Sequence, residues 1–509
     1  MHVASEESIF ALRRRLEMGF EHFASSLVAR ALLSNGPRKL VLDTIERRLI
    51  AAKGVFANPN LPSRAEQDKL DMAKALLEST RRALEREQLS YTVVHRMLKV
   101  FLVNTLLRQD PTLARAEEEF GRRHLGQRPP GLIVISPTKT CNLQCIGCYA
   151  SSNTTREHLE WDVLDRIVVE AKSLWGVRFF TISGGEPFLY RSQGKDLLDL
   201  ASSHSDCFFM TYTNGTLIDS RLAERMAKTG NLTPAISLEG FQSRTDARRG
   251  PGVFDRILKA MANLRKAGVP FGISLTATRD NAEEILSDKF LDFFFEEQQA
   301  VYGWLFQYMP IGRSYTLDLL VSPEQRLQIW RRTWQIIRER KILLADFWNC
   351  GTVSNGCIAA GQAGGGGYLY IDWNGKVMPC VFVPYAAANI HKVFGHDGTL
   401  DNLFDLPYFQ GIRQWQADYV SGGQRTAECG NLLRPCSLRD HYDAGRRLID
   451  QYHPEPEDVA AAQALEDEDY RNGLLAYDRQ LKDVFDPIWE QQYLHGRTNE
   501  LPQVTDEAL

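Results

Sequence analysis

The sequence has no long apolar run. A helix that crosses a bilayer needs about 18 or more consecutive apolar residues, and the nearest candidate, residues 91–107, is interrupted by His95, Arg96 and Lys99. We therefore expect a buried helix there. The first ten residues include Glu6 and Glu7 and lead into no apolar segment typical of a secretion signal. These absences predict a cytoplasmic protein in a reducing, oxygen-poor setting.

The chain also lacks a strong charge of either sign. Its 60 Lys and Arg against 64 Asp and Glu give a net charge of −4, which argues against nucleic acid as a partner. Nine cysteines could suggest disulfides, but in a chain of 509 residues their spacing fits metal ligation better. This length allows two or three domains.

Three of the cysteines lie close together at Cys141, Cys145 and Cys148. With three and then two residues between them, their thiolates can reach one metal centre from a single loop. An iron–sulfur cube held by three cysteines keeps one of its four irons free for a ligand other than protein. The alternative is a structural zinc loop. Zinc sites usually pair two Cys-x-x-Cys knuckles, however, and the sequence shows no second knuckle after this one.

An apolar segment downstream of the triad ends in a second motif. Residues 177–182 read as a buried strand, which runs into Gly184, Gly185, Glu186 and Pro187. Two glycines at a strand end let backbone groups approach a ligand closely, because no Cβ intervenes. Glu186 could then accept a hydrogen bond from an ammonium group, directly or through its backbone.

These two motifs together resemble the radical SAM superfamily. In that family the free iron chelates the amino and carboxylate groups of S-adenosylmethionine, and Tyr149 stands at the aromatic position next to the last cysteine. The Gly-Gly-Glu run at 184–186 is similar to the family motif that holds the amino group of this cosubstrate.

The resemblance extends to three further positions. It implies that Asn214 and Ser237, each at the end of an apolar segment, contact the ribose or carboxylate of S-adenosylmethionine. It also implies that Arg249 pairs with the methionyl carboxylate. Family members usually have aspartate where this sequence has Glu239.

From residue 132 onward, apolar segments alternate with helical patterns, which predicts a parallel sheet with right-handed crossovers. Six strands match the partial (β/α)6, TIM-like barrel of the radical SAM family, open on one side so that a large substrate can enter. The strands are predicted at 132–136, 177–182, 207–212, 233–238, 270–276 and 301–309. The helices are predicted at Trp161–Leu174, Lys195–Ser203, Asp219–Lys228, Val253–Ala267 and Ala282–Glu297.

A cysteine-containing extension follows the barrel. Residues 368–372 and 377–380 read as strands joined by Asn374-Gly375, a signal for a type I′ hairpin turn. The spacing from Gly375 to Cys380 resembles the hairpin of SPASM and twitch domains, which bind one or two auxiliary iron–sulfur clusters. The extension has too few cysteines for two clusters, so we expect one. Its ligands are predicted as Cys357, Cys380 and Cys436, with Cys429, Cys350 or no residue as the fourth.

A zinc-held hairpin is the alternative to this auxiliary cluster. Two further residues of types that can bind metals are assigned other roles. Cys207, inside a predicted strand, reads as a small buried apolar residue. His441, which follows Cys436, is predicted to be a hydrogen-bonding residue rather than a metal ligand.

The first 128 residues read as helical. An apolar stripe from Ile9 to Leu27, with Arg13, Arg14 and Arg15 beside it, predicts an amphipathic helix. This helix either packs on its own domain or makes a peripheral contact with a membrane or a partner. Four segments are therefore predicted: a helical domain over 1–128, a radical SAM core over 129–320, a SPASM/twitch-like domain over 321–445 and a helical tail over 446–509.

The resemblance implies a reaction. A donor such as ferredoxin or flavodoxin reduces the cluster, one electron cleaves S-adenosylmethionine, and the resulting 5′-deoxyadenosyl radical abstracts hydrogen from an unactivated carbon. We expect a peptide or small-molecule substrate. A lipid or membrane-associated substrate is the alternative. A non-catalytic iron–sulfur electron-transfer protein is less favoured, because a carrier needs neither the Gly-Gly-Glu strand end nor a six-stranded barrel.

Overall fold

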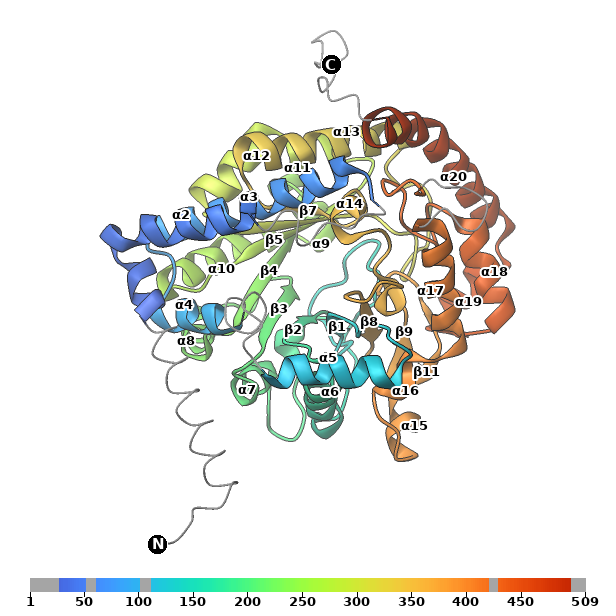
Figure 1. Ribbon diagram of the computed structural model, residues 1–509, viewed down its shortest axis with the longest axis horizontal. Helices are drawn as coiled ribbons and strands as arrows, with labels where there is room; N and C mark the ends of the chain where they lie inside the picture. The colour runs from blue at the N-terminus through green and yellow to red at the C-terminus, as the bar shows by residue number, and fades with distance from the viewer. Residues whose placement is uncertain (1–26, 52–60, 101–110, 421–428, 496–509) are drawn as a thin grey trace, which may run out of the picture.

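A curved sheet of ten strands forms the centre of the molecule, with helices on its outside (Figure 1). The computed structural model describes residues 27–51, 61–100, 111–420 and 429–495. The strand order is β11-β9-β8-β1-β2-β3-β4-β5-β6-β7, and every neighbouring pair from β8 to β7 is parallel. The predicted partial barrel is confirmed.

All six predicted barrel strands are present, with ends within two residues of the prediction. They are β1 (Leu132–Ile135), β2 (Phe179–Ile182), β3 (Phe208–Thr213), β4 (Leu232–Leu238), β5 (Gly272–Ala277) and β6 (Tyr302–Gln307). The crossover helices are α6 (Trp161–Trp175), α7 (Leu197–Ser203), α8 (Ser220–Thr229), α9 (Gln242–Arg249), α10 (Val253–Ala267), α11 (Ala282–Leu286) and α12 (Asp288–Leu291).

The local sequence explains where these helices begin and why one of them is broken. Asp219 caps α8, because its carboxylate accepts a hydrogen bond from the backbone N–H of Leu222. The helix predicted over 282–297 is instead three pieces. Ser287 ends α11 in extended backbone and caps α12, and a π-helical segment, Asp292–Glu297, completes the crossover.

The described part of the amino-terminal region is helical, as predicted. It contains α2 (Asn35–Ala51), α3 (Ser63–Glu85), α4 (Tyr91–Met97) and α5 (Pro111–Arg123). Buried ion pairs attach α3 to the later chain, since Asp68 and Asp71 lie 2.6 and 2.8 Å from the Arg338 guanidinium. The stripe before Leu27 and the arginine run fall outside the described residues. Among the helices that the structure describes, none is long and apolar enough to span a bilayer.

The predicted extension continues the sheet of the barrel. Strand β7 (Leu344–Asp346) pairs with β6, and β8 (Tyr368–Ile371) pairs with β1 from Leu132↔Tyr368 to Ile135↔Ile371. The strands β9 (Lys376–Met378) and β11 (Ala388–Asn389) follow β8 at this edge, whereas β10 (Tyr385–Ala386) pairs with β12 (Glu455–Pro456). Hence the predicted boundary at residue 320 does not separate two sheets.

The predicted hairpin between β8 and β9 is confirmed, but the predicted type I′ turn is wrong. A type I′ turn needs positive φ at both central residues. Gly375 has φ +76°, whereas Asn374 is not among the residues with positive φ. The N–H of Gly375 donates to the carbonyl of Asp372, and the backbone N–H of Asp372 donates to the carbonyl of Lys376. Three residues therefore form the loop, with glycine in the left-handed position.

Helices complete the extension and the tail. They are α13 (Pro323–Gln335), α14 (Gly351–Ser354), α15 (Ile390–Gly395), α16 (Asp401–Phe404), α17 (Pro407–Val420), α18 (Tyr442–Tyr452), α19 (Val459–Glu466) and α20 (Glu468–Trp489). Two π-helical segments, Ile336–Arg340 and Glu490–Leu494, continue α13 and α20. The tail is helical as predicted, although α18 crosses the predicted boundary at residue 446.

Candidate active site

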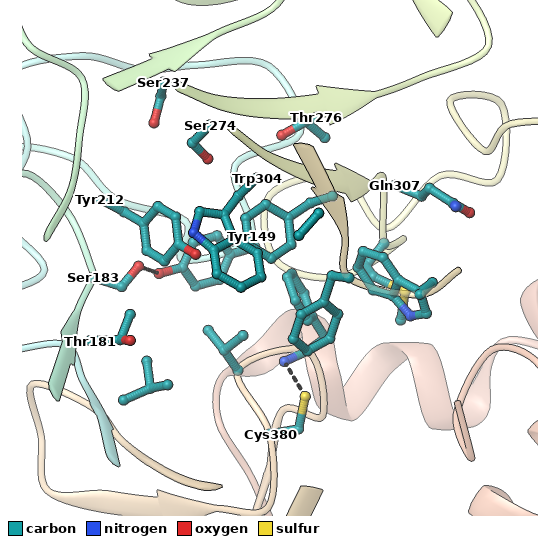
Figure 2. Close-up of a pocket in the computed structure, with 18 of the residues that line it drawn as sticks. Tyr149, Thr181, Ser183, Tyr212, Ser237, Ser274, Thr276, Trp304, Gln307 and Cys380 are labelled. Atoms are coloured by element: carbon teal, nitrogen blue, oxygen red, sulfur yellow. Dashed lines mark hydrogen bonds between the residues drawn. The ribbon is translucent and has the colours of Figure 1, made fainter. Parts of the chain in front are cut away.

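The inner face of the barrel strands and parts of the extension surround one cavity of about 480 Å³ (Figure 2). Cys141, Cys145 and Cys148 line it on one side. Four cysteines of the extension line it as well, namely Cys350, Cys357, Cys380 and Cys436. The fold thus brings two cysteine sets, far apart in sequence, to a common space.

The triad loop is held by backbone hydrogen bonds from distant segments. The N–H of Arg313 donates to the carbonyl of Cys148 at 3.0 Å, and its guanidinium donates to the carbonyl of Cys145 at 3.3 Å. A Cβ at Gly312 would lie 2.1 Å from the carbonyl oxygen of Tyr149, so only glycine fits there. Sequence reasoning did not assign this anchoring role to Gly312 and Arg313.

The arrangement of the triad thiols is compatible with a multi-iron cluster, and this assignment stays a prediction. Burial, with smaller contributions from Glu186 and the other two thiols, raises the pKa of Cys141 to about 11, so deprotonation there needs a metal. Among the described residues, no three His, Cys, Asp or Glu side chains come close enough to hold one metal ion. A mononuclear zinc site needs such a group, whereas a multi-iron cluster spreads its thiolate ligands apart.

The Gly-Gly-Glu strand end packs against the segment that leads into the triad. A Cβ at Gly185 would lie 2.3 Å from the carbonyl oxygen of Thr140, so this glycine allows the close approach of two backbones. Gly184 and Gly185 both line the cavity. Their predicted contact with S-adenosylmethionine stays a prediction.

The carboxylate of Glu186 does not point into the cavity. The side chain is 0% exposed and accepts hydrogen bonds from Thr213 Oγ1 at 2.7 Å, from the N–H of Asn214 at 2.8 Å and from the N–H of Phe188 at 3.2 Å. Burial raises the pKa of this carboxyl group to about 7, although the three hydrogen bonds act to lower it. Glu186 therefore joins the ends of β2 and β3, a role that sequence reasoning missed because its partners lie on another strand.

Tyr149 connects the triad loop to the end of β2. Its hydroxyl oxygen lies 2.7 Å from Ser183 Oγ and accepts a hydrogen bond from the N–H of Gly184 at 3.1 Å (Figure 2). Burial raises the pKa of Tyr149 to about 12, so the phenol stays protonated.

The three positions implied by the resemblance all line the cavity. Ser237 points into it from the end of β4 (Figure 2). Asn214 donates to Asn142 Oδ1 at 2.9 Å, with its amide nitrogen 3.9 Å from Cys141 Sγ. Arg249 is paired with Glu239, since its Nε donates to Glu239 Oε1 at 3.0 Å.

Glu239 is shared by two arginines. Arg248 lies 2.6 Å from Glu239 Oε2, and Arg249 contacts Oε1. Burial acts to lower the pKa of Arg249, but the charges of Glu239 and of the nearby thiols hold it above its ordinary value. One positive charge is therefore left beside the triad, where it can face a carboxylate or the cluster.

In the extension, three cysteines influence each other electrostatically. Burial, together with Cys436, raises the pKa of Cys357 to about 11, and burial with both other thiols raises that of Cys380. The Tyr368 hydroxyl lies 2.9 Å from Cys380 Sγ. These are the three ligands predicted as the firmest, and their site is a cluster candidate for the same reason as the triad.

The structure places the two candidates for a fourth ligand differently. Cys350 lines the cavity but is buried beside Asp346 and Asp68, which act with burial to raise the pKa of its thiol. Cys429 does not line the cavity, and its thiol donates to the carbonyl of Gly430 at 3.3 Å. The ligation by Cys429, by Cys350 or by neither stays a prediction.

Cys207 and His441 are placed as predicted. Cys207 is 0% exposed inside the barrel core. The ring Nε2 of His441 lies 2.8 Å from the carbonyl oxygen of Arg434, which accepts its hydrogen bond.

A buried ionic network supports the Cys436 loop, and sequence reasoning did not find it. Asp440 lies 2.6 Å from Arg326 and 3.0 Å from Arg439, and its carboxylate accepts from the N–H of Cys436 at 3.3 Å. Burial raises the pKa of Asp440, but the charges of both arginines outweigh it and hold that pKa well below its usual range. Arg439 also donates to Gln307 Oε1 at 3.1 Å, which links the loop to the cavity wall.

The chain is similar in sequence and in fold to known proteins. Residues 135–288 match the family model of the radical SAM superfamily. An AdoMet-dependent heme synthase of Methanosarcina barkeri is 29% identical over 288 residues, which cover 52% of this chain and 80% of that protein. The mycofactocin maturase MftC of Mycolicibacterium smegmatis is 28% identical over 344 residues, which cover 65% of this chain and 80% of that protein.

Among solved structures, Streptococcus suis SuiB bound to its precursor peptide SuiA has a similar fold. The TM-score is 0.51 at 19% sequence identity, and the match covers 68% of this chain and 79% of SuiB. At this level of identity the likeness concerns the fold.

Proposed function

We propose that the chain is a radical SAM enzyme with a SPASM/twitch-like extension and that it abstracts a hydrogen atom from an unactivated carbon of a peptide or small molecule. The observation that carries this proposal is the single cavity lined by both cysteine sets. A substrate in that cavity would lie between the two proposed cluster sites. A non-catalytic electron carrier would need no such enclosed space.

Radical SAM enzymes bind a [4Fe–4S] cluster and S-adenosylmethionine, and the donor set here fits them. Cys141, Cys145 and Cys148 would hold the catalytic cluster. Gly184, Gly185, Asn214, Ser237 and Arg249, which line the same end of the cavity, would hold the cosubstrate. When bound, these groups supply hydrogen-atom abstraction by a carbon-centred radical.

The chain's own residues orient the reactants and exclude water. Tyr149 fixes the triad loop to the end of β2 through Ser183 and Gly184. Arg249, supported by Glu239, would attract the carboxylate of the cosubstrate. The apolar lining of the cavity keeps water away from the reacting carbon.

Cys357, Cys380 and Cys436 would hold one auxiliary cluster at the other end of the cavity. There it could accept an electron from the substrate, supply one or bind the substrate directly. The enzyme needs a one-electron donor, and we propose a ferredoxin or flavodoxin for this role.

The relatives named above support both substrate classes. MftC is a maturase by name and matches 65% of this chain, which favours a peptide. The heme synthase match covers 52% and favours a small molecule. Neither relative assigns the substrate of this chain.

Anaerobic reconstitution tests the proposal. The reconstituted protein, reduced with dithionite, should convert S-adenosylmethionine to 5′-deoxyadenosine and methionine, measured by mass spectrometry. Candidate substrates carrying deuterium at the reacting carbon should transfer it to 5′-deoxyadenosine. A Cys207→Ala variant is the matched control, because Cys207 is a core cysteine outside the cavity. An absence of 5′-deoxyadenosine from fully loaded protein would refute the proposal.

A further inference from the structure

The cavity has two ends of different chemistry. The end at the triad is polar and includes Ser183, Asn214 and Ser237. The end at the extension is aromatic and is lined by Trp304, Phe306, Phe347, Trp348 and Phe382. In Figure 2, Tyr212 and Trp304 lie between Ser237 and Ser274 on one side and Cys380 on the other.

Strand β6 explains why large aromatic side chains face the cavity. Tyr302, Trp304 and Phe306 alternate with Gly303, Leu305 and Gln307 along this strand. The three aromatic residues are only partly buried, whereas Gly303, Leu305 and Gln307 are buried. This partial burial is notable because β6 lies between β5 and β7 in the sheet. A barrel interior is normally filled by packed side chains. Here the inward aromatic residues border empty space.

The aromatic residues form one connected surface. The ring centroid of Phe306 lies 5.5 Å from those of Tyr212 and Phe347 and 5.7 Å from that of Phe382. Phe382 in turn lies 4.9 Å from Trp348. Phe382 follows the auxiliary ligand candidate Cys380 by two positions, so this surface reaches the extension. Another ring placed here can make edge-to-face and offset contacts with several of them.

Few charged side chains line the cavity, and each of them has a partner in the protein. Within the described part of the chain, the Asp, Glu, Lys, Arg and His side chains that line the cavity are Arg248, Arg249 and Asp346, beside the seven cysteines named above. Arg248 and Arg249 both pair with Glu239, so one positive charge remains without a negative partner, and it lies at the triad end. Asp346 is 0% exposed and accepts hydrogen bonds from Gln307 and Asn349.

The side chains of the aromatic surface itself therefore offer no counter-charge to a ligand. A carboxylate or ammonium group placed there would lose its hydration without gaining an ion pair, at a cost of several kcal/mol. An uncharged ring would lose little hydration and would gain both apolar burial and ring contacts.

We propose that the aromatic end of the cavity binds an uncharged aromatic ring of the substrate, on the side of the reacting carbon nearest the extension. This inference rests on the proposed function, because it assigns the occupant of the same cavity. The ring could be a side chain of a peptide or part of a free small molecule. Both share the chemistry that these residues recognise.

Fluorine NMR on the reconstituted, unreduced protein with saturating S-adenosylmethionine tests this directly. The probes are N-acetyl-5-fluorotryptophanamide for a peptide side chain, 5-fluoroindole for a free ring, and 5-fluoroindole-3-acetate as the charged match. At least one neutral probe should bind, and the charged probe should bind about tenfold more weakly or worse, since its carboxylate finds no partner. Whichever neutral probe binds more tightly identifies the source of the ring.

Variants place the binding site. Trp304→Ala and Phe306→Leu should each weaken binding of the neutral probe about fivefold or more, because each removes a ring contact. The matched control is Trp415→Ala. Trp415 is a partly buried tryptophan of α17 that stacks on Tyr419 and does not line the cavity. Phe306→Leu keeps the site apolar, so it remains informative if Trp304→Ala fails to fold.

Three results would overturn the inference: no binding of either neutral probe, equal binding of the charged probe, or binding unchanged in both cavity variants. Loss of the probe on adding S-adenosylmethionine would place the ring at the polar end and would also overturn it. The same samples, reduced with dithionite, are assayed for 5′-deoxyadenosine. If cleavage proceeds without probe binding, the inference fails while the proposed function stands. If cleavage is absent, the proposed function fails.

Discussion

The two ends of the cavity hold their cysteines in different ways. The triad comes from one loop, residues 141–148, fixed by contacts from Gly312 and Arg313. Cys357, Cys380 and Cys436 come from three separate segments, brought together by the β8–β9 hairpin and the buried Arg326–Asp440 pair. The first site needs a correct loop, whereas the second needs the tertiary fold. Disturbing the fold should therefore affect the second site first.

The largest effect should follow removal of the triad. Replacing Cys141, Cys145 and Cys148 with alanine should remove about four irons per chain and abolish 5′-deoxyadenosine formation. The auxiliary site should keep its iron, because its ligands lie on other segments. Iron analysis and mass spectrometry measure both outcomes. Residual 5′-deoxyadenosine from the triple variant would contradict the assignment.

Removal of one auxiliary ligand should separate cleavage from product formation. Cys357→Ala or Cys380→Ala should lower the iron content from about eight to about four per chain and stop product formation. Some uncoupled cleavage of S-adenosylmethionine should remain.

Cys429→Ala is the matched control for these variants, because Cys429 lies outside the cavity and should leave the iron content unchanged. Loss of iron in this variant would make Cys429 the fourth ligand after all. The same measurement on Cys350→Ala decides the other candidate. Zinc in place of iron at this site would refute the auxiliary cluster.

The support of the extension should be sensitive to acid. Burial, followed by the charge of Arg434, lowers the pKa of His441 to about 4. Between pH 6.5 and 4 the unfolded chain binds a proton there and the folded chain does not. The free energy of unfolding should thus fall by up to about 3 kcal/mol as the pH drops through this window.

Denaturant titrations of metal-free protein at several pH values measure this dependence. In His441→Gln, whose side-chain amide can still donate to the Arg434 carbonyl, the dependence should be shallower than in the wild type. His396→Gln, which replaces an exposed histidine, serves as the control. Equal slopes in wild type and His441→Gln would show that His441 does not couple this region to pH.

The smallest effect is expected at the polar end. Ser237→Ala removes one hydroxyl from the cavity wall and should weaken S-adenosylmethionine binding by about 1 kcal/mol, roughly fivefold, without loss of iron. Anaerobic calorimetry measures the change. Ser274→Ala, one strand away on the same wall, is the control. Equal effects of the two variants would remove Ser237 from the set of specific contacts.

The contrast between a site built from one loop and a site built from distant segments also explains what the sequence could predict. The triad and the Gly-Gly-Glu run each lie within a short stretch of sequence, so each motif could be recognised locally and predicted a site. The alternation of strands and helices predicted the barrel. The direction of the Glu186 carboxylate depends on Thr213 and Asn214 on the neighbouring strand, which no local pattern reveals.

The extension was less predictable for the same physical reason. Asn374-Gly375 predicted a hairpin, but loop length and the sign of φ at Asn374 decide the turn type, and these depend on the register of the flanking strands. Cys350 and Cys429 are equally plausible ligands by sequence, yet the fold brings only the first to the cavity. The inward aromatic face of β6 could have been predicted, because aromatic residues occupy every second position at Tyr302, Trp304 and Phe306.

The parallel pairing of β8 with β1 limits how this enzyme can be taken apart. A chain truncated near residue 320 would leave one side of Leu132–Ile135 without its hydrogen-bonding neighbour, and exposed strand edges promote aggregation. A chimaera that exchanges the extension with that of a relative has to keep this seam intact, either by retaining Tyr368–Ile371 or by importing a strand of matching register. Barrel and extension are thus one unit for protein engineering, although their cysteine sets can be altered separately.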